Sequence, residues 1–200
     1  MSDRPLHPGS ALAGLALPGR YGKGGEPGIV IAERSGLGLA AVAARKGAPV
    51  RAAVKASYRV DLPDDSTVVQ GPEVSFVGYG PGQWLAVSEK LAGDGLAQDL
   101  KHRLKGLASI SDQSGGRTVL RLSGPRARDV LAKGLPIDLH PRAFGPGSAA
   151  TSTISLMGVQ LWQVDDAPSY DIALFRSLSA SFWRWLTASA AEFGYEVTTS

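Results

Sequence analysis

The chain has 200 residues, of which 44% are hydrophobic and 20% charged, and its formal net charge is +3. This composition is typical of a globular protein with a sizeable core, and the small net charge gives no reason to expect nucleic-acid binding. The absence of cysteine excludes disulfides, thiolate metal sites and a cysteine nucleophile, and it fits a cytoplasmic location. No apolar run approaches the roughly 18 residues needed to cross a bilayer, so no membrane contact is expected.

The first 28 residues show no sustained hydrophobic period. Residues 1–28 contain seven glycines and four prolines. Such a composition favours a disordered tail or an extended arm that becomes ordered on a partner. Arg20 and Tyr21, which precede a glycine-rich stretch, are more typical of an arm than of a core element.

The globular part is predicted to begin near Ile29. Pro49 suits the first position of a helix, where no N–H is needed, and Asp94 is expected to cap a second helix. The elements predicted for the first half are strands at 29–31 and 37–44, a helix from Pro49 that stops before Leu62, a hairpin of 74–79 and 83–88, and a helix from Asp94 to Gly106 with Leu96, Leu100 and Leu104 on one face.

The second half is predicted to follow a similar order. Ser123 is interpreted as a cap at a strand-to-helix turn rather than as a nucleophile. In the last helix, Phe182 and Trp185 are expected to face inward, and Trp183 to lie nearer a partner. The predicted elements are strands at 108–111 and 117–122, a helix from Gly124-Pro125 to Gly134, strands at 151–156, 159–165 and 170–175, and a final helix with Phe182, Leu186, Ala190 and Phe193 on one stripe.

A weak internal repeat sets the expected fold class. Each half runs strand, helix, hairpin, helix, which predicts two split β-α-β (ferredoxin-like) units in tandem. The element order gives an α+β fold rather than an alternating α/β fold. We therefore expect an extended N-terminal arm at 1–28 and one α+β domain at 29–200, built from halves at about 29–106 and 107–200.

No residue pattern is typical of a catalytic, cofactor-binding or metal site. The glycine motif at 36–41 matches a dinucleotide fingerprint weakly, because Glu33-Arg-Ser35 separates it from the preceding strand. The three histidines are dispersed, whereas a metal site needs converging ligands. Paired acids at 64–65 and 165–166 stand beside prolines and are interpreted as turn residues.

The glycine motif at 36–41 and the basic pI allow a small nucleotide- or RNA-binding domain as a third hypothesis, and a basic cluster in the second half has to be weighed with it. The predicted strand 117–122 carries none of the aromatic residues on which an RNA-recognition module stacks bases. A solvated or partner-facing basic face is therefore preferred. The cluster consists of Arg117, Arg121, Arg126, Arg128 and Lys133.

Several motifs, in order along more than 100 residues, resemble the gamma subunit of heterotetrameric sarcosine oxidase. The resemblance runs from about Ile29 to the C-terminus. The motifs are Gly80-Pro-Gly-Gln-Trp-Leu-Ala-Val87, Asp112-Gln-Ser-Gly-Gly-Arg-Thr-Val-Leu-Arg-Leu-Ser-Gly-Pro125, Leu135-Pro-Ile-Asp-Leu-His-Pro141, Leu161-Trp162 and Phe175-Arg-Ser-Leu-Ser-Ala-Ser-Phe-Trp-Arg-Trp-Leu186.

The resemblance implies a fold similar to the folate-binding domain of the glycine-cleavage aminomethyltransferases. It also implies assembly with alpha, beta and delta subunits into an enzyme that oxidises sarcosine to glycine and hydrogen peroxide and passes the one-carbon unit to tetrahydrofolate. In that family the FAD, FMN, NAD, zinc and tetrahydrofolate sites are expected on the partner subunits. The gamma chain is not expected to carry catalytic residues, so none is transferred to this sequence.

Two hypotheses from different classes therefore lead. The first is a non-catalytic oxidase subunit that docks through the arm and the aromatic helix, with Arg20, Tyr21, Trp183 and Arg184 as candidate interface residues. The second is a stand-alone tetrahydrofolate-binding protein of the aminomethyltransferase fold. The second would need a carboxylate buried in a pterin pocket, for which Asp112 and Asp171 are the candidates.

Overall fold

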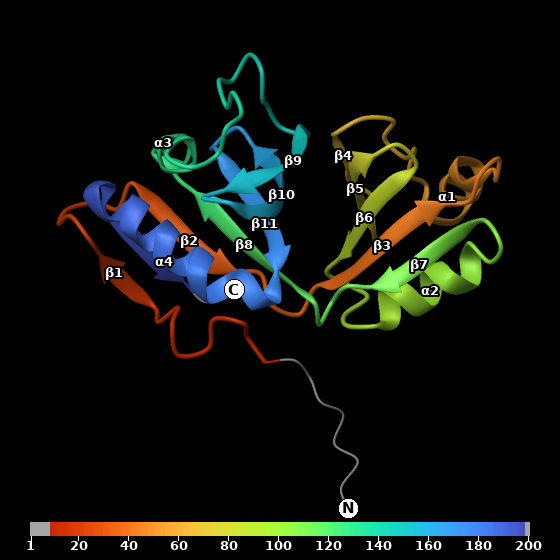
Figure 1. Cartoon of the computed structure of the whole chain (residues 1–200), viewed down its shortest axis with the longest axis horizontal. Coiled ribbons are helices and arrows are strands. Elements are labelled where there is room, and N and C mark those ends of the chain that lie inside the picture. The colour runs from red at the N-terminus through yellow and green to blue at the C-terminus, as the bar shows by residue number, and fades with distance from the viewer. Residues whose placement is uncertain (1–8, 199–200) are drawn as a thin grey trace, which may run out of the picture.

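The computed structural model describes residues 9–198 and shows two β-sheets that face each other across the middle of the molecule (Figure 1). Two helices cover the outer face of each sheet, so the order of layers is helices, sheet, sheet, helices. The four α-helices are α1 (Val50–Tyr58), α2 (Gly95–Arg103), α3 (Ala127–Ala132) and α4 (Ser179–Ala190), and the short 3₁₀ helices are η1 (Arg176–Leu178) and η2 (Ala191–Phe193).

The five-stranded sheet contains the first split β-α-β unit. Its strand order is β4-β5-β6-β3-β7, and every pair of neighbours is antiparallel. Three of these strands, β3, β5 and β6, follow the predicted order of strand, helix, hairpin, helix, and β7, predicted as part of the second half, completes the unit. The strands are β3 (Gly38–Ala44), β4 (Val68–Val69), β5 (Ser75–Gly80), β6 (Gln83–Ser88) and β7 (Ala108–Asp112).

The seven-stranded sheet contains the second unit and three additional strands. Its order is β1-β12-β2-β8-β11-β10-β9, with β12 and β2 parallel and all other neighbours antiparallel. The strands are β1 (Gly19–Tyr21), β2 (Ile29–Glu33), β8 (Arg117–Ser123), β9 (Ala149–Ile154), β10 (Met157–Asp165), β11 (Ser169–Phe175) and β12 (Tyr195–Thr198).

The two predicted halves, 29–106 and 107–200, differ from the two sheets at two strands. Strand β2 precedes the first unit in sequence but lies between β12 and β8 of the second sheet, whereas β7 closes the first sheet. Gly124 makes this insertion possible, because a Cβ atom there would lie 2.6 Å from the carbonyl oxygen of Gly28. The tandem α+β prediction is correct, but the chain crosses between the units instead of completing one before the other.

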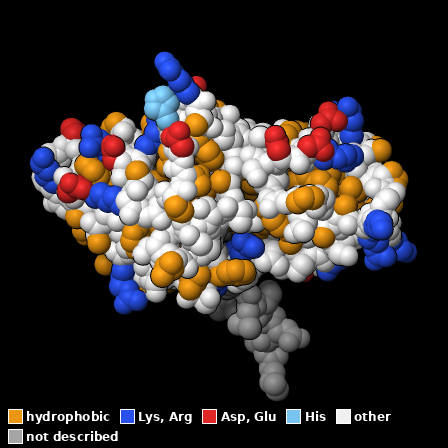
Figure 2. All heavy atoms as spheres, turned by 45° about the horizontal axis from the view of Figure 1, so that its top comes forward, with side chains coloured by type: hydrophobic (Ala, Val, Ile, Leu, Met, Phe, Trp, Pro, Cys, Tyr) orange, Lys and Arg blue, Asp and Glu red, His pale blue; other side chains and the backbone are white. Residues whose placement is uncertain are grey.

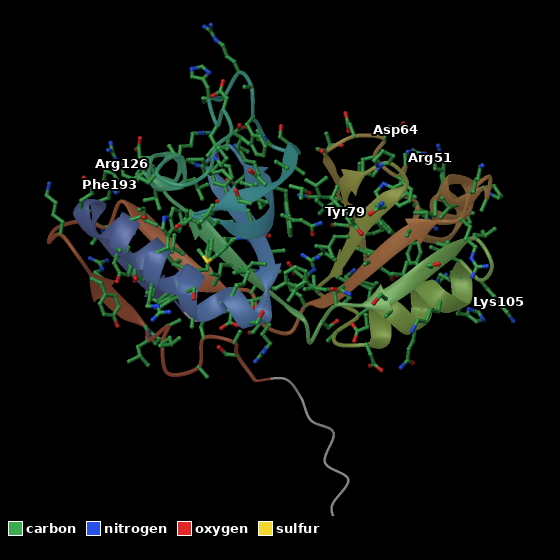
Figure 3. All side chains as sticks on the ribbon, viewed as in Figure 1. Arg51, Asp64, Tyr79, Lys105, Arg126 and Phe193 are labelled. Atoms are coloured by element: carbon green, nitrogen blue, oxygen red, sulfur yellow. The ribbon has the colours of Figure 1, made fainter. Side chains whose placement is uncertain are left out.

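Three hydrophobic clusters fill the spaces between the layers. One lies between the seven-stranded sheet and α3 with α4, a second lies between the five-stranded sheet and α1 with α2, and the third lies between the sheets. The third includes Leu39 and Leu85 from one sheet and Val119 and Trp162 from the other. Tyr79 packs against it and points from β5 toward the opposite sheet (Figure 3).

The N-terminal segment is part of the domain from Ser10 onward, which corrects the expectation of an arm at 1–28. Leu12 is buried in the cluster beneath α4 with only 1% of its surface exposed. Glu33 holds this turn in place by accepting hydrogen bonds from the backbone N–H of Ala11, at 2.9 Å, and from the Ser10 hydroxyl. Farther on, β1 pairs with β12, and residues 1–8 of the predicted arm lie outside the described residues.

Two predictions of side-chain capping are wrong, although both helices exist and Asp94 does occupy the N-cap position of α2. The Asp94 carboxylate accepts a hydrogen bond from the Gln98 side chain at 2.6 Å and makes no side-chain cap to the backbone of α2. At the start of α3 the N-cap residue is Arg126, three positions after Ser123. The predicted buried stripe of α2 is confirmed, because Leu96, Leu100 and Leu104 are fully buried.

The aromatic helix α4 lies mostly in the core. Phe182 and Leu186 are fully buried as predicted, but Trp183 is also buried, with 8% of its surface exposed. Trp185 is only partly buried, which reverses the order expected for the two tryptophans. Trp185 covers Gly134, where a Cβ atom would lie 2.7 Å from its ring.

Replacement of Leu12 by alanine tests whether the N-terminal segment belongs to the core. We expect Leu12→Ala to lower the free energy of unfolding by about 2–5 kcal/mol, because it leaves a cavity beneath α4. Leu17→Ala is the matched control, because Leu17 is 57% exposed and its truncation should change stability by less than about 0.5 kcal/mol. Urea denaturation measures both values, and equal effects would contradict the burial of Leu12.

Candidate functional site: the cavity between the sheets

Asp171 is the one charged residue that is buried among residues 9–198. It lies on β11, which is flanked on both sides by other strands, and its side chain is 5% exposed. Strand alternation places Ile172 in the cluster beneath the helices, and Asp171 therefore faces the opposite sheet. Trp162 is its cross-strand neighbour on β10.

Two arginines neutralise Asp171. Arg121 lies directly opposite on β8, and its Nε and Nη2 atoms each donate a 2.7 Å hydrogen bond to the Asp171 carboxylate. Arg34, just after β2, donates from Nη1 to Asp171 Oδ2 at 3.0 Å. The hydrogen bond to Asp171 raises the pKa of Arg121 above its ordinary value, so this guanidinium stays charged.

Arg34 also connects the two sheets. Its Nη2 atom pairs with Glu89, which follows β6 of the five-stranded sheet, while Nη1 binds Asp171 in the seven-stranded sheet. The Arg34 side chain is 15% exposed, whereas Glu89 is 73% exposed. The bond to Asp171 is therefore the better shielded of the two, and the bond to Glu89 is screened by solvent.

A cavity of about 380 Å³ opens between the sheets beside this cluster. Both sheets line it, with Val77 and Val87 on one side and Trp162 and Val164 on the other. Its charged lining residues are balanced, because three are basic and three are acidic. They are Arg34, Lys90, Arg121, Glu73, Glu89 and Asp171.

The arrangement supports binding or structural support better than acid–base chemistry. Both carboxylate oxygens of Asp171 already accept hydrogen bonds from guanidinium groups, so this acid is poorly placed to take a proton from a ligand. Histidine is absent from the lining of the cavity. Within residues 9–198, no group of three or more potential metal ligands comes together.

Of the two carboxylates considered for a pterin pocket, only Asp171 lines a cavity. Asp112 lies at the exposed end of β7, where Oδ1 accepts hydrogen bonds from the Ser114 backbone N–H at 2.9 Å and from the Ser114 hydroxyl at 2.7 Å. It is therefore a turn residue. The glycine motif at 36–41 leads into strand β3 rather than a helix, so it does not form a dinucleotide site.

The predicted basic cluster is divided between two sides of the seven-stranded sheet. Arg117 stacks over the Phe175 ring with 4.8 Å between the guanidinium carbon and the ring centre, and burial lowers its pKa. Arg126 lies on the outer side over Phe193, at 4.4 Å (Figure 3). On the face shown in Figure 2, acidic and basic side chains are interspersed and form no continuous basic patch.

The four candidate interface residues lie on two elements. Arg20 and Tyr21 belong to edge strand β1, where Arg20 pairs with Glu196 at 3.3 Å and Tyr21 stacks on Tyr195. Trp183 and Arg184 belong to α4, which covers the outer face of the same sheet (Figure 1). Tyr21 and Arg184 are exposed, whereas Trp183 is buried and has little surface to offer a partner.

Sequence reasoning missed Arg34 as a member of the buried cluster. Its partners Asp171 and Glu89 are far away in sequence, and nothing local distinguishes Arg34 from an ordinary loop residue. A partial signal for Arg121 existed, because the apolar alternation of 118–122 leaves Arg121 on the opposite face of its strand.

Comparison with known proteins identifies relatives of the chain. Residues 43–192 match the family described as "Sarcosine oxidase, gamma subunit family". A sarcosine oxidase subunit gamma from Arthrobacter sp is 35% identical over 145 residues, covering 71% of this chain and 70% of the relative. One from Corynebacterium sp. (strain U-96) is 33% identical over 160 residues, covering 78% and 75%.

Two solved structures resemble the fold. A chain of heterotetrameric sarcosine oxidase from Corynebacterium sp. U-96, in complex with pyrrole 2-carboxylate, superposes with a TM-score of 0.75 and 29% identity, covering 85% of this chain and 87% of that one. Glycine cleavage system aminomethyltransferase T from Bartonella henselae gives a TM-score of 0.60 at 14% identity, covering 86% and 48%. The second likeness supports the predicted fold alone.

Replacement of Asp171 by asparagine tests the buried cluster. We expect Asp171→Asn to lower the free energy of unfolding by about 3 kcal/mol, because it leaves two guanidinium groups without their anion. The effect is at the lower end of the range for buried pairs, since Arg121 keeps 33% of its side chain exposed. Urea denaturation at neutral pH measures the change.

Asp64→Asn is the matched control for this substitution. Asp64 pairs with Arg51 at the surface of the first unit, and its side chain is 88% exposed (Figure 3). Loss of this pair should cost less than about 1 kcal/mol. If both variants lost the same stability, the Asp171 cluster would not be the stabilising feature described above.

Proposed function

The chain belongs to the sarcosine oxidase gamma subunit family, and from this membership we propose that it works as the gamma subunit of a heterotetramer with alpha, beta and delta subunits. The observation that supports the proposal best is its 29% identity and TM-score of 0.75 to a chain of a heterotetrameric sarcosine oxidase. The match covers 85% of this chain, so it includes both sheets and their helices rather than one unit.

The proposed complex oxidises sarcosine to glycine and hydrogen peroxide and passes the one-carbon unit to tetrahydrofolate. The FAD, FMN, NAD, zinc and tetrahydrofolate sites are proposed to belong to the partner subunits. This chain is proposed to contribute no catalytic residue. The ion pairs of Asp171 with Arg34 and Arg121 support this proposal, because both carboxylate oxygens already accept hydrogen bonds and are not free to act on a substrate.

The proposed complex is cytoplasmic. Among residues 9–198, no helix combines the length and the apolar character that crossing a membrane requires. The absence of cysteine also fits a reducing compartment.

Docking is proposed to use the outer side of the seven-stranded sheet. Tyr21 is 40% exposed, and Leu15 and Leu17 of the preceding segment are 48% and 57% exposed. Aromatic residues and arginine are enriched at protein interfaces, and Arg20 and Arg184 are available beside this group. The buried Trp183 is proposed to hold α4 against the seven-stranded sheet, while the exposed Arg184 contacts the partner subunit.

A stand-alone tetrahydrofolate-binding protein is the second candidate function. The cavity of about 380 Å³ between the sheets, lined by Trp162 and Asp171, favours it. The two arginines bound to Asp171 weigh against it, because a pterin would have to displace one of them to reach the carboxylate.

Titration calorimetry with tetrahydrofolate separates the two candidates. We expect no binding heat from the isolated chain, because its buried acid is saturated. A saturable heat that Asp171→Asn abolishes would instead establish the folate-binding function. The fold of the variant is checked by circular dichroism in the same experiment.

Co-expression with candidate alpha, beta and delta subunits tests the main proposal. We expect the chain to co-purify with them, and their assembly to weaken when Tyr21→Ala and Arg184→Glu are combined, by about tenfold in dissociation constant for a loss of 1.4 kcal/mol. Lys101→Glu on α2 is the matched charge-reversal control, and it should assemble normally. Full activity and assembly of the other subunits without this chain would contradict the proposal.

A further inference from the structure

Among residues 9–198, the hairpin of β9 and β10 leaves one edge of the seven-stranded sheet unpaired over part of its length. Strand β9 is the last strand of the sheet, and it pairs with β10 through Ala149 to Ile154. The outward direction is shown by Ala149, whose N–H donates away from β10 to the Ser66 carbonyl at 2.9 Å. Backbone groups of alternate residues point to the same side of a strand, so those of Thr151 and Thr153 also point away from β10. They lie farther along β9 than Ala149, the residue that bonds to Ser66.

This edge lacks the protection that exposed strand edges normally carry. No charged residue occurs from Ala143 to Val164, although 20% of the whole chain is charged. The strand also contains no proline, and its register with β10 is regular. Proteins usually block such edges with charges, prolines or bulges, because an unblocked edge pairs with other strands.

The remaining strand edges differ from β9. On the far side of the same sheet, β1 has only three residues and carries Arg20. In the other sheet, β4 has two residues, and β7 ends at Asp112. Strand β9 combines six residues, a regular register and no charge, and is therefore the edge best suited to accept another strand.

The tip of the hairpin adds a second, independent observation. Ser155 and Leu156 form its two-residue turn, and both have positive φ angles, 48° and 68°. Such turns favour asparagine and glycine, because a larger side chain is strained in this conformation. Leu156 is nonetheless 96% exposed, the most exposed of the large hydrophobic residues that the structure describes.

We propose that the edge of β9 and the side chain of Leu156 together form a docking site for another oxidase subunit. An extended, uncharged segment of that subunit pairs with the backbone of Thr151 and Thr153, and Leu156 enters an apolar pocket beside it. This inference rests on the proposed function, because it assumes that the chain assembles with partner subunits.

The chemistry of the hairpin determines the kind of partner it fits. Backbone pairing supplies affinity without any particular side chain, and the exposed threonines can accommodate a neighbouring strand. Because the hairpin carries no charge from Ala143 to Val164, it offers no salt bridge and would leave a charged partner surface desolvated and unpaired. The complementary surface is therefore an uncharged strand with an adjacent apolar pocket.

The proposal gives this site to a different subunit rather than to a second copy of the chain. The similar chain of known structure is part of a heterotetramer, in which partner subunits are present to cover such a surface. In a pair of identical copies related by a twofold axis, two β9 strands would meet, and each exposed Leu156 would need a pocket on the other copy. The cavity between the sheets, the one that lies on the same side of the sheet as Ala149 of β9, has six charged residues in its lining, which suits a leucine poorly.

Added charges on the edge test the pairing. We expect Thr151→Lys combined with Thr153→Lys to raise the dissociation constant between this chain and its partner subunits at least tenfold. Biolayer interferometry with the purified full-length chain and the purified, co-expressed partner subunits measures this constant. The matched control is Ser109→Lys combined with Ser111→Lys, which adds the same charge to the exposed edge of β7. The control should change the dissociation constant less than about twofold, which is about 0.4 kcal/mol.

Leu156→Gly gives a readout that a merely structural role would not produce. Glycine relieves the positive φ angle, so the isolated variant should melt at the same temperature as the wild type or higher. Its affinity for the partner subunits should nevertheless fall at least tenfold. Unchanged affinity, or a loss of affinity accompanied by loss of stability, would overturn the role of Leu156.

The outcomes separate this inference from the proposed function. If the wild-type chain does not bind the partner subunits, the proposed function fails. If the wild type binds and the β9 variants bind equally well, or if the β7 control is weakened as strongly as they are, only the β9 inference fails. A wild-type dimer in light scattering that the β9 lysines dissociate, with unchanged binding to the partner subunits, would assign the edge to a second copy and overturn the proposal.

Discussion

The insertion of β2 between β12 and β8 is the constraint on which the rest of the structure depends. It places the segment before the first unit within the sheet of the second, so the two ferredoxin-like units form one domain. It also brings Arg34, the residue after the strand, into the space between the sheets. There Arg34 meets Asp171 and links it to Glu89 of the other sheet. The buried cluster and the cavity beside it follow from this crossing.

Local patterns predicted the four α-helices and nine of the described strands, because local forces determine most of them, but β1, β4 and β12 were not predicted. Pro49 marked the start of α1, and helical spacing identified the buried leucines of α2. The pattern could not reveal that β2 joins the other sheet or that Leu12 is buried, because both depend on segments distant in sequence. Capping by Asp94 failed for a local reason, since its carboxylate accepts a hydrogen bond from the Gln98 side chain, four residues along the same helix. The sequence pointed to Asp171 as a candidate site residue. Its hydrogen bond with Arg34 could not be predicted, because 137 residues separate the two in sequence.

The aromatic C-terminal helix illustrates how composition can mislead about surfaces. Its tryptophans suggested a contact surface, yet Trp183 is buried and Trp185 rests on Gly134. Apart from Phe175 at the end of β11, the exposed large hydrophobic residues that the structure describes lie instead beside β1 and at the tip of the β9–β10 hairpin. These two places are at opposite edges of one sheet, so a subunit held at both would have its orientation fixed in the assembly.

The pairing of β2 with β12 also has a consequence for biosynthesis. Ile29 is among the first structured residues to leave the ribosome, but its parallel partner Tyr195 is among the last. The five-stranded unit has all its strands once β7 has emerged, so it can fold while the remainder is still being translated. During this time the apolar strand β2 has no partner, because its neighbours β8 and β12 have not yet been synthesised. Completion of the seven-stranded sheet is therefore a late, long-range event, of the kind that slows folding and exposes nascent chains to aggregation.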